Sequence, residues 1–275
     1  MDDKLFQQSS GEPSFVAIGD SFTEGLNDAA PGGGFRGWAD RLAGLLAAEY
    51  PGLRYANLAV RGKLLRQIVG EQVPAAAAMA PGLVSMAGGG NDILRPGADP
   101  DVLAELFDAA VARLRASGAQ VLMFTCFDPV ATPVIKLRRG RIGTYNMHLR
   151  GIADARGCYL VDLWSMRFLR AAGAWSQDRL HLTAESHQRV ALRACEVLGV
   201  PVTEDWRAPL AADEPSSALE AMTRGAWLAA RREDARWARE YLAPWINRRL
   251  HGTSSGDGRS AKRPALEPVA PPVRS

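Results

Sequence analysis

Ser21 lies in the stretch GDSFTEG, two residues after Gly19, which ends the apolar run that begins at Phe15. An apolar run that ends at a glycine is typical of a buried strand, so Ser21 is expected where a strand gives way to a helix. A serine at such a junction has two alternative roles. Its hydroxyl could be a nucleophile, or it could cap the helix, because Ser21 and Glu24 match the S-x-x-E capping box. A nucleophilic Ser21 should turn its Oγ toward a base and away from the N–H of Glu24.

A serine hydroxyl becomes a useful nucleophile only when a general base accepts its proton. The candidate base is His181 in the stretch QDRLHLT, because Asp178 precedes it by three residues. In a tight turn, a carboxylate at this spacing can accept the Nδ1–H of the imidazole and leave Nε2 free for Ser21. A D-x-x-H pair is common and is not diagnostic by itself. The remaining histidines fall in helical stretches or in the C-terminal tail, and they are His148, His187 and His251.

Acyl transfer also needs hydrogen-bond donors directed at the oxyanion that develops during the reaction. Three donors are expected at one edge of the predicted sheet: the backbone N–H groups of Ser21 and Gly62, and the side-chain amide of Asn91. Glycine at position 62 would let the backbone approach a ligand closely. The stretch GGGND around Asn91 also fits a plain strand-to-helix turn. Two neighbouring acidic residues, Asp20 and Asp92, are expected to support these turns rather than to react.

Alternating strands and helices must position these residues. Five apolar runs predict strands at 15–19, 54–58, 83–87, 121–126 and 158–163. Helical stretches at 37–50, 101–117, 144–156 and 184–198 separate or follow them. This order predicts βαβ units and a three-layer α/β/α domain over residues 13–202, after a polar tail at 1–12. Ligands of such folds bind beyond the carboxyl ends of the strands, where the candidate residues gather.

Composition excludes several classes of protein. The chain has 275 residues, is 47% hydrophobic and carries a net charge of +3, which are ordinary values for a soluble globular protein. No apolar run reaches the length of a membrane span, and the polar N-terminus does not resemble a secretory signal, so a cytoplasmic location is expected. Three widely spaced cysteines predict neither a disulfide framework nor a metal site. No motif for reading nucleic acid is present.

The C-terminal part carries the excess positive charge. Residues 203–250 are interpreted as a linker followed by a basic amphipathic helix, in which Trp237, Tyr241 and Trp245 recur at four-residue steps. Such a helix is compatible with weak contact to an anionic membrane surface, and the favoured alternative is that its aromatic stripe packs on the catalytic domain. Residues 251–275 are rich in Gly, Ser and Pro, which predicts a disordered tail.

Four blocks in order, GDSFTEG, NLAVRG, GGND and DRLHLT, resemble those of the SGNH hydrolases, the GDSL-type esterases and lipases. The name-giving residues correspond to Ser21, Gly62, Asn91 and His181. The resemblance covers about residues 13–200, and the extension beyond it is similar to those of uncharacterised actinobacterial members. It implies a flavodoxin-like, five-stranded parallel sheet of order 2-1-3-4-5, and a Ser21–His181–Asp178 triad. It also implies an oxyanion hole from Ser21, Gly62 and Asn91, and no metal or organic cofactor.

The implied function is a serine esterase that hydrolyses carboxylic esters of small acyl, lipid or acyl-sugar type through an acyl-enzyme. An acyltransferase with the same triad, and a scaffold or membrane-surface binding protein of the same fold, remain as alternatives. The partner is then a small-molecule ester, and the oligomeric state is left open. Specificity is expected in the loops at 27–35 and 127–143, of which the second carries several basic residues.

Overall fold

The computed structural model describes residues 5–6, 12–131, 133–210, 232, 235–244, 247 and 253–271. Six strands form one sheet in the order β5-β4-β3-β1-β2-β6. The first five strands are parallel, so their order is the expected 2-1-3-4-5. The strands are β1 (Ser14–Ile18), β2 (Arg54–Asn57), β3 (Leu83–Met86), β4 (Gln120–Phe124), β5 (Tyr159–Val161) and β6 (Arg263–Pro268).

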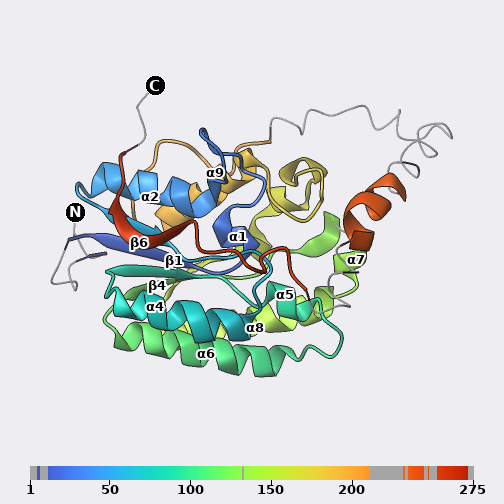
Figure 1. Ribbon diagram of the computed structural model, residues 1–275, viewed down its shortest axis with the longest axis horizontal. Helices are drawn as coiled ribbons and strands as arrows, with labels where there is room; N and C mark the ends of the chain where they lie inside the picture. The colour runs from blue at the N-terminus through green and yellow to red at the C-terminus, as the bar shows by residue number, and fades with distance from the viewer. Residues whose placement is uncertain are drawn as a thin grey trace.

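Helices cover both faces of this sheet, which confirms the three-layer prediction (Figure 1). On one face lie α2 (Gly37–Glu49) and α9 (Ala184–Leu198), and on the other lie α4 (Val73–Ala78), α6 (Pro100–Ala116) and α8 (Arg139–Arg156). Shorter helices sit at the strand ends and connections: α1 (Ser21–Glu24), α3 (Leu65–Gln67), α5 (Gly90–Ile93), α7 (Pro133–Lys136), the π-helical turns Ile68–Gln72 and Ala238–Leu242, and four 3₁₀ turns at Pro129–Ala131, Leu163–Ser165, Arg167–Arg170 and Ala172–Ala174.

The core is divided by the sheet into two apolar clusters. Successive residues of β1 alternate between them: Phe15 packs toward α2 and α9, whereas Val16 packs toward α6 and α8. All five residues of β1 are buried, as expected for the central strand of a sheet covered on both faces. Each fully buried large apolar side chain contributes about 1.5–3 kcal/mol. The central strand that leads into Ser21 is therefore among the most firmly held segments.

Capping residues explain where the long helices begin and end. The α6 helix begins after Asp99, whose carboxylate accepts the N–H of Asp101, and Pro100 occupies its first turn. The α9 helix begins after Thr183, whose hydroxyl accepts the N–H of Ser186. It ends at Gly199, which adopts the left-handed conformation. These caps agree with the helix limits expected from the apolar spacing to within about one residue.

The disordered tail predicted for 251–275 is wrong for residues 253–271. Within them, β6 pairs antiparallel with β2 and adds a sixth strand to the predicted five. Without β6, β2 would present a row of unpaired main-chain groups at the sheet edge. The two prolines of β6 are tolerated because it is itself an edge strand. Composition missed this strand because main-chain hydrogen bonds hold it, and these require few large apolar side chains.

Two further expectations need correction, and one lies partly outside the described residues. The expected loop at 127–143 is largely helical, since it holds α7 and the first turn of α8. In the expected tail at 1–12, Leu5 is only 4% exposed and belongs to the core. Of the aromatic stripe in the C-terminal extension, Trp245 lies outside the described residues, so only Trp237 and Tyr241 are placed. No helix in the described ranges is long and apolar enough to span a bilayer.

Candidate active site

Ser21 is the first residue of α1, directly after β1 and the N-cap residue Asp20. The hydroxyl of Ser21 lies 3.0 Å from Nε2 of His181. Asp20, and not Ser21, caps the helix, because its Oδ1 accepts the N–H of Phe22 at 3.1 Å. The carboxylate of Glu24 reaches the main-chain N–H of Arg61 at 2.7 Å and also pairs with its guanidinium. The Ser21–Glu24 capping box therefore does not form, and Oγ is left to face the imidazole.

Asp178 and His181 lie together in the loop between β5 and α9. Nδ1 of His181 is 2.6 Å from Oδ2 of Asp178. Oδ1 of Asp178 accepts three further hydrogen bonds, from the N–H groups of Leu180 and His181 at 3.0 Å and from Ser176 Oγ at 2.8 Å. Burial acts to raise the pKa of Asp178, but the hydrogen bond and charge of His181 and the two backbone donors hold that pKa well below its usual range. Asp178 is thus an anion at neutral pH.

A neighbouring asparagine, which the sequence did not single out, completes the surroundings of Asp178. The side-chain amide of Asn27 donates to Asp178 Oδ2 at 2.7 Å and to Ser176 Oγ at 2.8 Å. Asn27 adopts a positive φ of 71°, a conformation that asparagine tolerates better than most residues. It lies in the loop that follows α1, so α1 and the loop after it supply both Ser21 and a partner for Asp178.

The two other expected oxyanion donors lie at the same edge of the sheet. Gly62 adopts a positive φ of 75°, and a Cβ there would collide with Ser254 Oγ. Asn91, on α5, donates from Nδ2 to Asp20 Oδ2 at 3.0 Å and to the carbonyl of Lys63 at 3.1 Å. Gly62 and Asn91 line one cavity together with Ser21 and His181. An oxyanion contact from Asn91 therefore requires that one of its two amide hydrogens be shared with the ligand.

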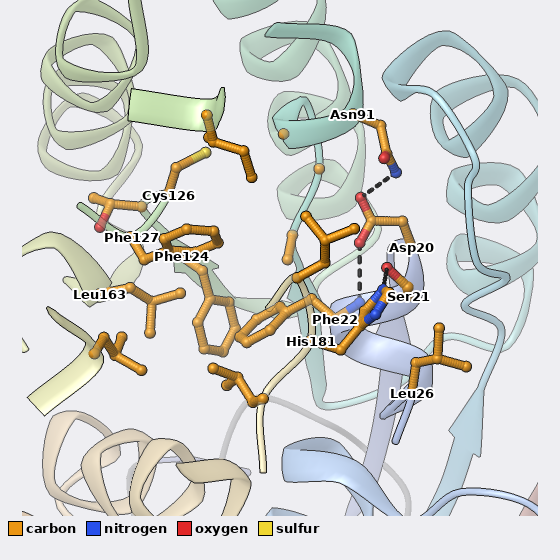
Figure 2. Close-up of a pocket in the computed structure, with 18 of the residues that line it drawn as sticks. Asp20, Ser21, Phe22, Leu26, Asn91, Phe124, Cys126, Phe127, Leu163 and His181 are labelled. Atoms are coloured by element: carbon orange, nitrogen blue, oxygen red, sulfur yellow. Dashed lines mark hydrogen bonds between the residues drawn. The ribbon is translucent and has the colours of Figure 1, made fainter. Parts of the chain in front are cut away.

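The two acidic residues expected to support turns form hydrogen bonds of that kind. Asp20 connects the start of α1 to Asn91, as Figure 2 shows. Asp92 accepts the N–H of Leu65 at 2.9 Å and so joins the third loop to the start of α3. These bonds link the first three strand ends to one another.

Gln72 is a supporting residue that sequence reasoning missed. It is 5% exposed and lies on the π-helical turn before α4. Its Oε1 accepts the N–H of Gly19 at 2.7 Å, and its Nε2 donates to the carbonyl of Gly19 at 2.9 Å. Gln72 therefore fixes both main-chain groups of the residue that leads into Asp20 and Ser21. No local signal indicates this contact, because the two residues are 53 positions apart.

Two cavities meet at Ser21 and His181. The first extends away from α1 between the sheet and the loop after β4, and Figure 2 shows Phe22, Phe124, Phe127 and Leu163 around it. Its lining is mainly apolar and aromatic. The second cavity opens on the other side of the same two residues. Its lining is more polar and includes residues from the C-terminal extension. Ser21 thus lies between an apolar compartment and a polar one.

Two titratable side chains in the apolar cavity stay neutral. Burial lowers the pKa of His187 to about 4, and its Nδ1 accepts the N–H of Trp38 at 3.2 Å. Burial, with the nearby charge of Asp20, raises the pKa of Cys126 to about 12. Neither group introduces a charge into this cavity near neutral pH, which suits it to an apolar ligand. In the described part of the chain, no group of three or more His, Cys, Asp or Glu side chains is arranged to hold a metal ion.

Three solved structures of similar fold are each less than 25% identical to the chain. One is LAE5, an alpha/beta hydrolase enzyme from the metagenome of Lake Arreo, with 23% identity and a TM-score of 0.60, covering 70% of this chain and 97% of its own. Axe2, an acetylxylan esterase from Geobacillus stearothermophilus, has 22% identity and a TM-score of 0.58, covering 73% and 99%. TesA has 24% identity and a TM-score of 0.54, covering 67% and 97%. At this identity the likeness supports the fold alone.

A comparison with curated protein sequences gives no match. The similarity of the C-terminal extension to actinobacterial proteins therefore stays a prediction. The model of the GDSL-like Lipase/Acylhydrolase family matches residues 17–189, more than half of the chain, and this range contains Ser21, Gly62, Asn91, Asp178 and His181. The chain therefore belongs to the GDSL-like lipase/acylhydrolase family and is a hydrolase of carboxylic esters.

Proposed function

We propose that the protein hydrolyses esters through a covalent acyl-enzyme on Ser21, with His181 as general base and Asp178 as its partner. The observation that carries this proposal is the continuous hydrogen-bonded chain from Ser21 Oγ to His181 Nε2, at 3.0 Å, and from His181 Nδ1 to Asp178 Oδ2, at 2.6 Å. This is the order of groups that serine hydrolases of unrelated folds use. The low pKa of Asp178 keeps the partner of the imidazole ionised.

Acylation begins when Ser21 Oγ attacks the ester carbonyl and His181 Nε2 takes the hydroxyl proton. Asp178 stabilises the imidazolium and holds the Nδ1–H tautomer, because its Oδ2 accepts that hydrogen. The carbonyl π bond breaks and its oxygen becomes an oxyanion. The N–H groups of Ser21 and Gly62 and the amide of Asn91 are the proposed donors to it. Loss of one such donor typically lowers the rate by about 10²–10³-fold.

The tetrahedral intermediate collapses when the bond to the alcohol oxygen breaks and His181 returns its proton to that oxygen. A water molecule then attacks the acyl-Ser21 carbonyl, and His181 again accepts and returns the proton. The products are the free acid and the regenerated serine. General base catalysis of this type contributes about 10²–10⁴-fold.

The apolar cavity is the proposed site for the acyl chain. It begins at Ser21 and is surrounded by Phe22, Phe124 and Leu163, with His187 and Cys126 both neutral. Transfer of each methylene from water into such a cavity contributes about 0.8 kcal/mol. The rate of hydrolysis should therefore rise as the acyl chain lengthens, until the chain fills the cavity.

The test is hydrolysis of p-nitrophenyl esters from acetate to decanoate by the wild type and by Ser21→Ala. The wild type should release p-nitrophenolate with an optimum above acetate, and Ser21→Ala should fall to background. Ser165→Ala is the matched control, because Ser165 is exposed and its hydroxyl bonds only the carbonyl of Asp162. Turnover by folded Ser21→Ala equal to that of the wild type would contradict the proposal.

A further inference from the structure

The polar cavity lies on the side of Ser21 opposite the proposed acyl site, so it faces the alcohol part of an ester. This inference rests on the proposed function, because it assigns the second half of the same substrate. Ser21, Asn91 and His181 line both cavities, which places the reacting carbonyl where the two meet. An ester consists of an acyl part and an alcohol part, joined at the reacting carbonyl. When the acyl chain occupies the apolar cavity, the alcohol part occupies the polar cavity.

Two arginines line this polar cavity, and their partners differ. Arg61 is engaged: its guanidinium pairs with Glu24 and lies 5.0 Å from the ring centre of Phe35. Arg95 lies one turn beyond Asn91, and its N–H donates to the carbonyl of Asp92 at 2.8 Å. In the described ranges, the buried Nε of Arg95 finds no hydrogen-bond partner. Among the described lining residues the acidic one is Asp178, and its carboxylate is already hydrogen-bonded to His181.

In the described ranges no carboxylate pairs with Arg95, so its charge beside the cavity is uncompensated until an anion reaches the guanidinium. Its planar fork suits two oxygens of one carboxylate or phosphate. The cavity that contains Ser21 supplies the space for such a group, because Arg95 and Ser21 both line it. The most complementary ligand is therefore an anion carried on the alcohol side of the ester.

The opposite wall of the cavity comes from the C-terminal extension, which lies outside the range matched by the family. Tyr241, Thr253, Ser254 and Ser255 line the cavity there, and the side chain of each carries a hydroxyl group. Ser254 is seated on the second loop, where its hydroxyl donates to the carbonyl of Arg61 at 3.4 Å. A lining of hydroxyl-bearing residues suits a polar alcohol better than a hydrocarbon.

We propose that Arg95 binds an anionic group on the leaving alcohol, so that the preferred substrates are acyl esters of alcohols that carry a phosphate or a carboxylate. The C-terminal residues 253–255 line the other side of this subsite and contact the polar body of the alcohol. Arg95 is then a specificity-determining residue, and it takes no part in the proton transfers.

The test compares two matched pairs of butyrate esters. The carboxylate pair is the ester of hydroxynitrobenzoate and that of the uncharged hydroxynitrobenzamide, followed by release of the nitrophenolate. The phosphate pair is butanoylglycerol phosphate and butanoylglycerol, followed by release of butyrate. The wild type should favour the anionic member of at least one pair, and the pair that responds identifies the anion.

Arg95→Gln should lower kcat/KM for the preferred anionic ester by about 10- to 100-fold, since hydrogen bonds to charged groups are of that strength. The change should fall mainly on KM, and kcat/KM for the neutral esters should be unchanged. Arg95→Lys should retain part of the preference, because it keeps the charge but loses the fork. Arg66→Gln is the matched control, because Arg66 is exposed and lies outside both cavities.

An independent measurement on the wild type does not depend on the folding of a variant. Glycerol phosphate should inhibit hydrolysis of p-nitrophenyl butyrate competitively at concentrations where glycerol does not. Absence of any preference for anions in both pairs, or an equal fall of anionic and neutral rates in Arg95→Gln, would overturn the inference while leaving the esterase intact. If the wild type hydrolyses no ester at all, the proposed function fails first, and this subsite falls with it.

Discussion

The body of the protein, residues 13–202, and its C-terminal extension, described at 235–244 and 253–271, both line the cavity at Ser21. Different interactions hold these two parts in place. In the body, apolar side chains bury both faces of a parallel sheet, and the reactive groups stand at its strand ends. In the extension, β6 is held by main-chain bonds to β2, and Lys262 donates to the carbonyls of Glu24, Phe35 and Arg36 and to Asp40. Trp237 donates its indole N–H to the carbonyl of Asp178. Hydrogen bonds, together with limited apolar packing by Ala261, Leu266 and Val269, thus join the extension to the body.

This difference separates two tasks that the site must perform. Proton transfer needs groups fixed to within a few tenths of an ångström, and the buried sheet supplies that rigidity. The proposed recognition of the alcohol can rest on a segment that docks on the surface, because its contacts need only select a ligand. Changes in the body should therefore affect turnover or global stability, whereas changes in the extension should affect docking and substrate preference.

The largest effect is expected from Asp178→Asn in the body. An amide at this position would favour the wrong tautomer of His181, so kcat should fall by about 10⁴-fold while the fold is kept. Rates with p-nitrophenyl butyrate and a circular dichroism spectrum check this prediction. Asp205→Asn is the matched control, since Asp205 is exposed and interacts with Arg207 away from the site. A fall of less than tenfold would remove Asp178 from the mechanism.

Gln72→Leu tests how far the body depends on one buried amide. It leaves the N–H and the carbonyl of Gly19 without their partners, so unfolding free energy should drop by about 2–6 kcal/mol. Urea unfolding measures the change, and kcat should fall as well because Gly19 leads into Ser21. Gln67→Leu is a milder control, because Gln67 is exposed and bonds only the N–H of Leu64. Equal losses in the two variants would argue against a special role for Gln72.

His187 predicts an acid sensitivity of the body. Burial lowers its pKa to about 4 in the folded state, against an ordinary 6.5, so the unfolded chain binds more protons in this range. Stability that is present above about pH 6.5 should be lost as the pH falls to about 4, by about 3 kcal/mol. Urea unfolding at several pH values should show this loss in the wild type and a smaller one in His187→Asn. Parallel pH curves for the two proteins would show that His187 does not cause the loss.

Lys262→Gln tests the extension and should have the smallest effect on global stability. The amide cannot replace the ammonium among three carbonyls and Asp40, so residues 253–271 should detach more often. Trypsin should then cut after Arg259 faster than in the wild type, while the urea midpoint of the body changes little. Arg259 lies between the docked Ser254 and Lys262. A loss of global stability as large as that of Gln72→Leu would show that the extension is part of the core.

The body could be predicted from its sequence because its signals are local. Apolar runs and helical spacing predicted five strands and the four long helices. Blocks at the strand ends indicated Ser21, Gly62, Asn91, Asp178 and His181 as the candidate site. These residues lie at one sheet edge because parallel strands end there. The structure then showed that Ser21 Oγ faces His181, as expected for a serine that does not cap its helix.

The extension and the supporting contacts could not be predicted in the same way. Gln72 acts on Gly19, and Glu24 on Arg61, across large sequence separations, and neither has a local pattern. The residues of β6 read as a disordered tail because their composition is polar, yet an edge strand with unpaired groups accepts them. The sequence did not indicate a role for Arg95, because an arginine after a turn is ordinarily a solvated residue. Contacts made by hydrogen bonds between residues far apart in the sequence are visible only in the three-dimensional structure.

The central claim is that Ser21 is the nucleophile and that His181 activates it. Labelling with a fluorophosphonate, followed by mass spectrometry of the digested protein, tests this most directly. The account predicts one adduct, on the peptide that contains Ser21, which is absent in Ser21→Ala and forms much more slowly in His181→Ala. An adduct on another residue, or equal labelling of folded Ser21→Ala, would contradict it.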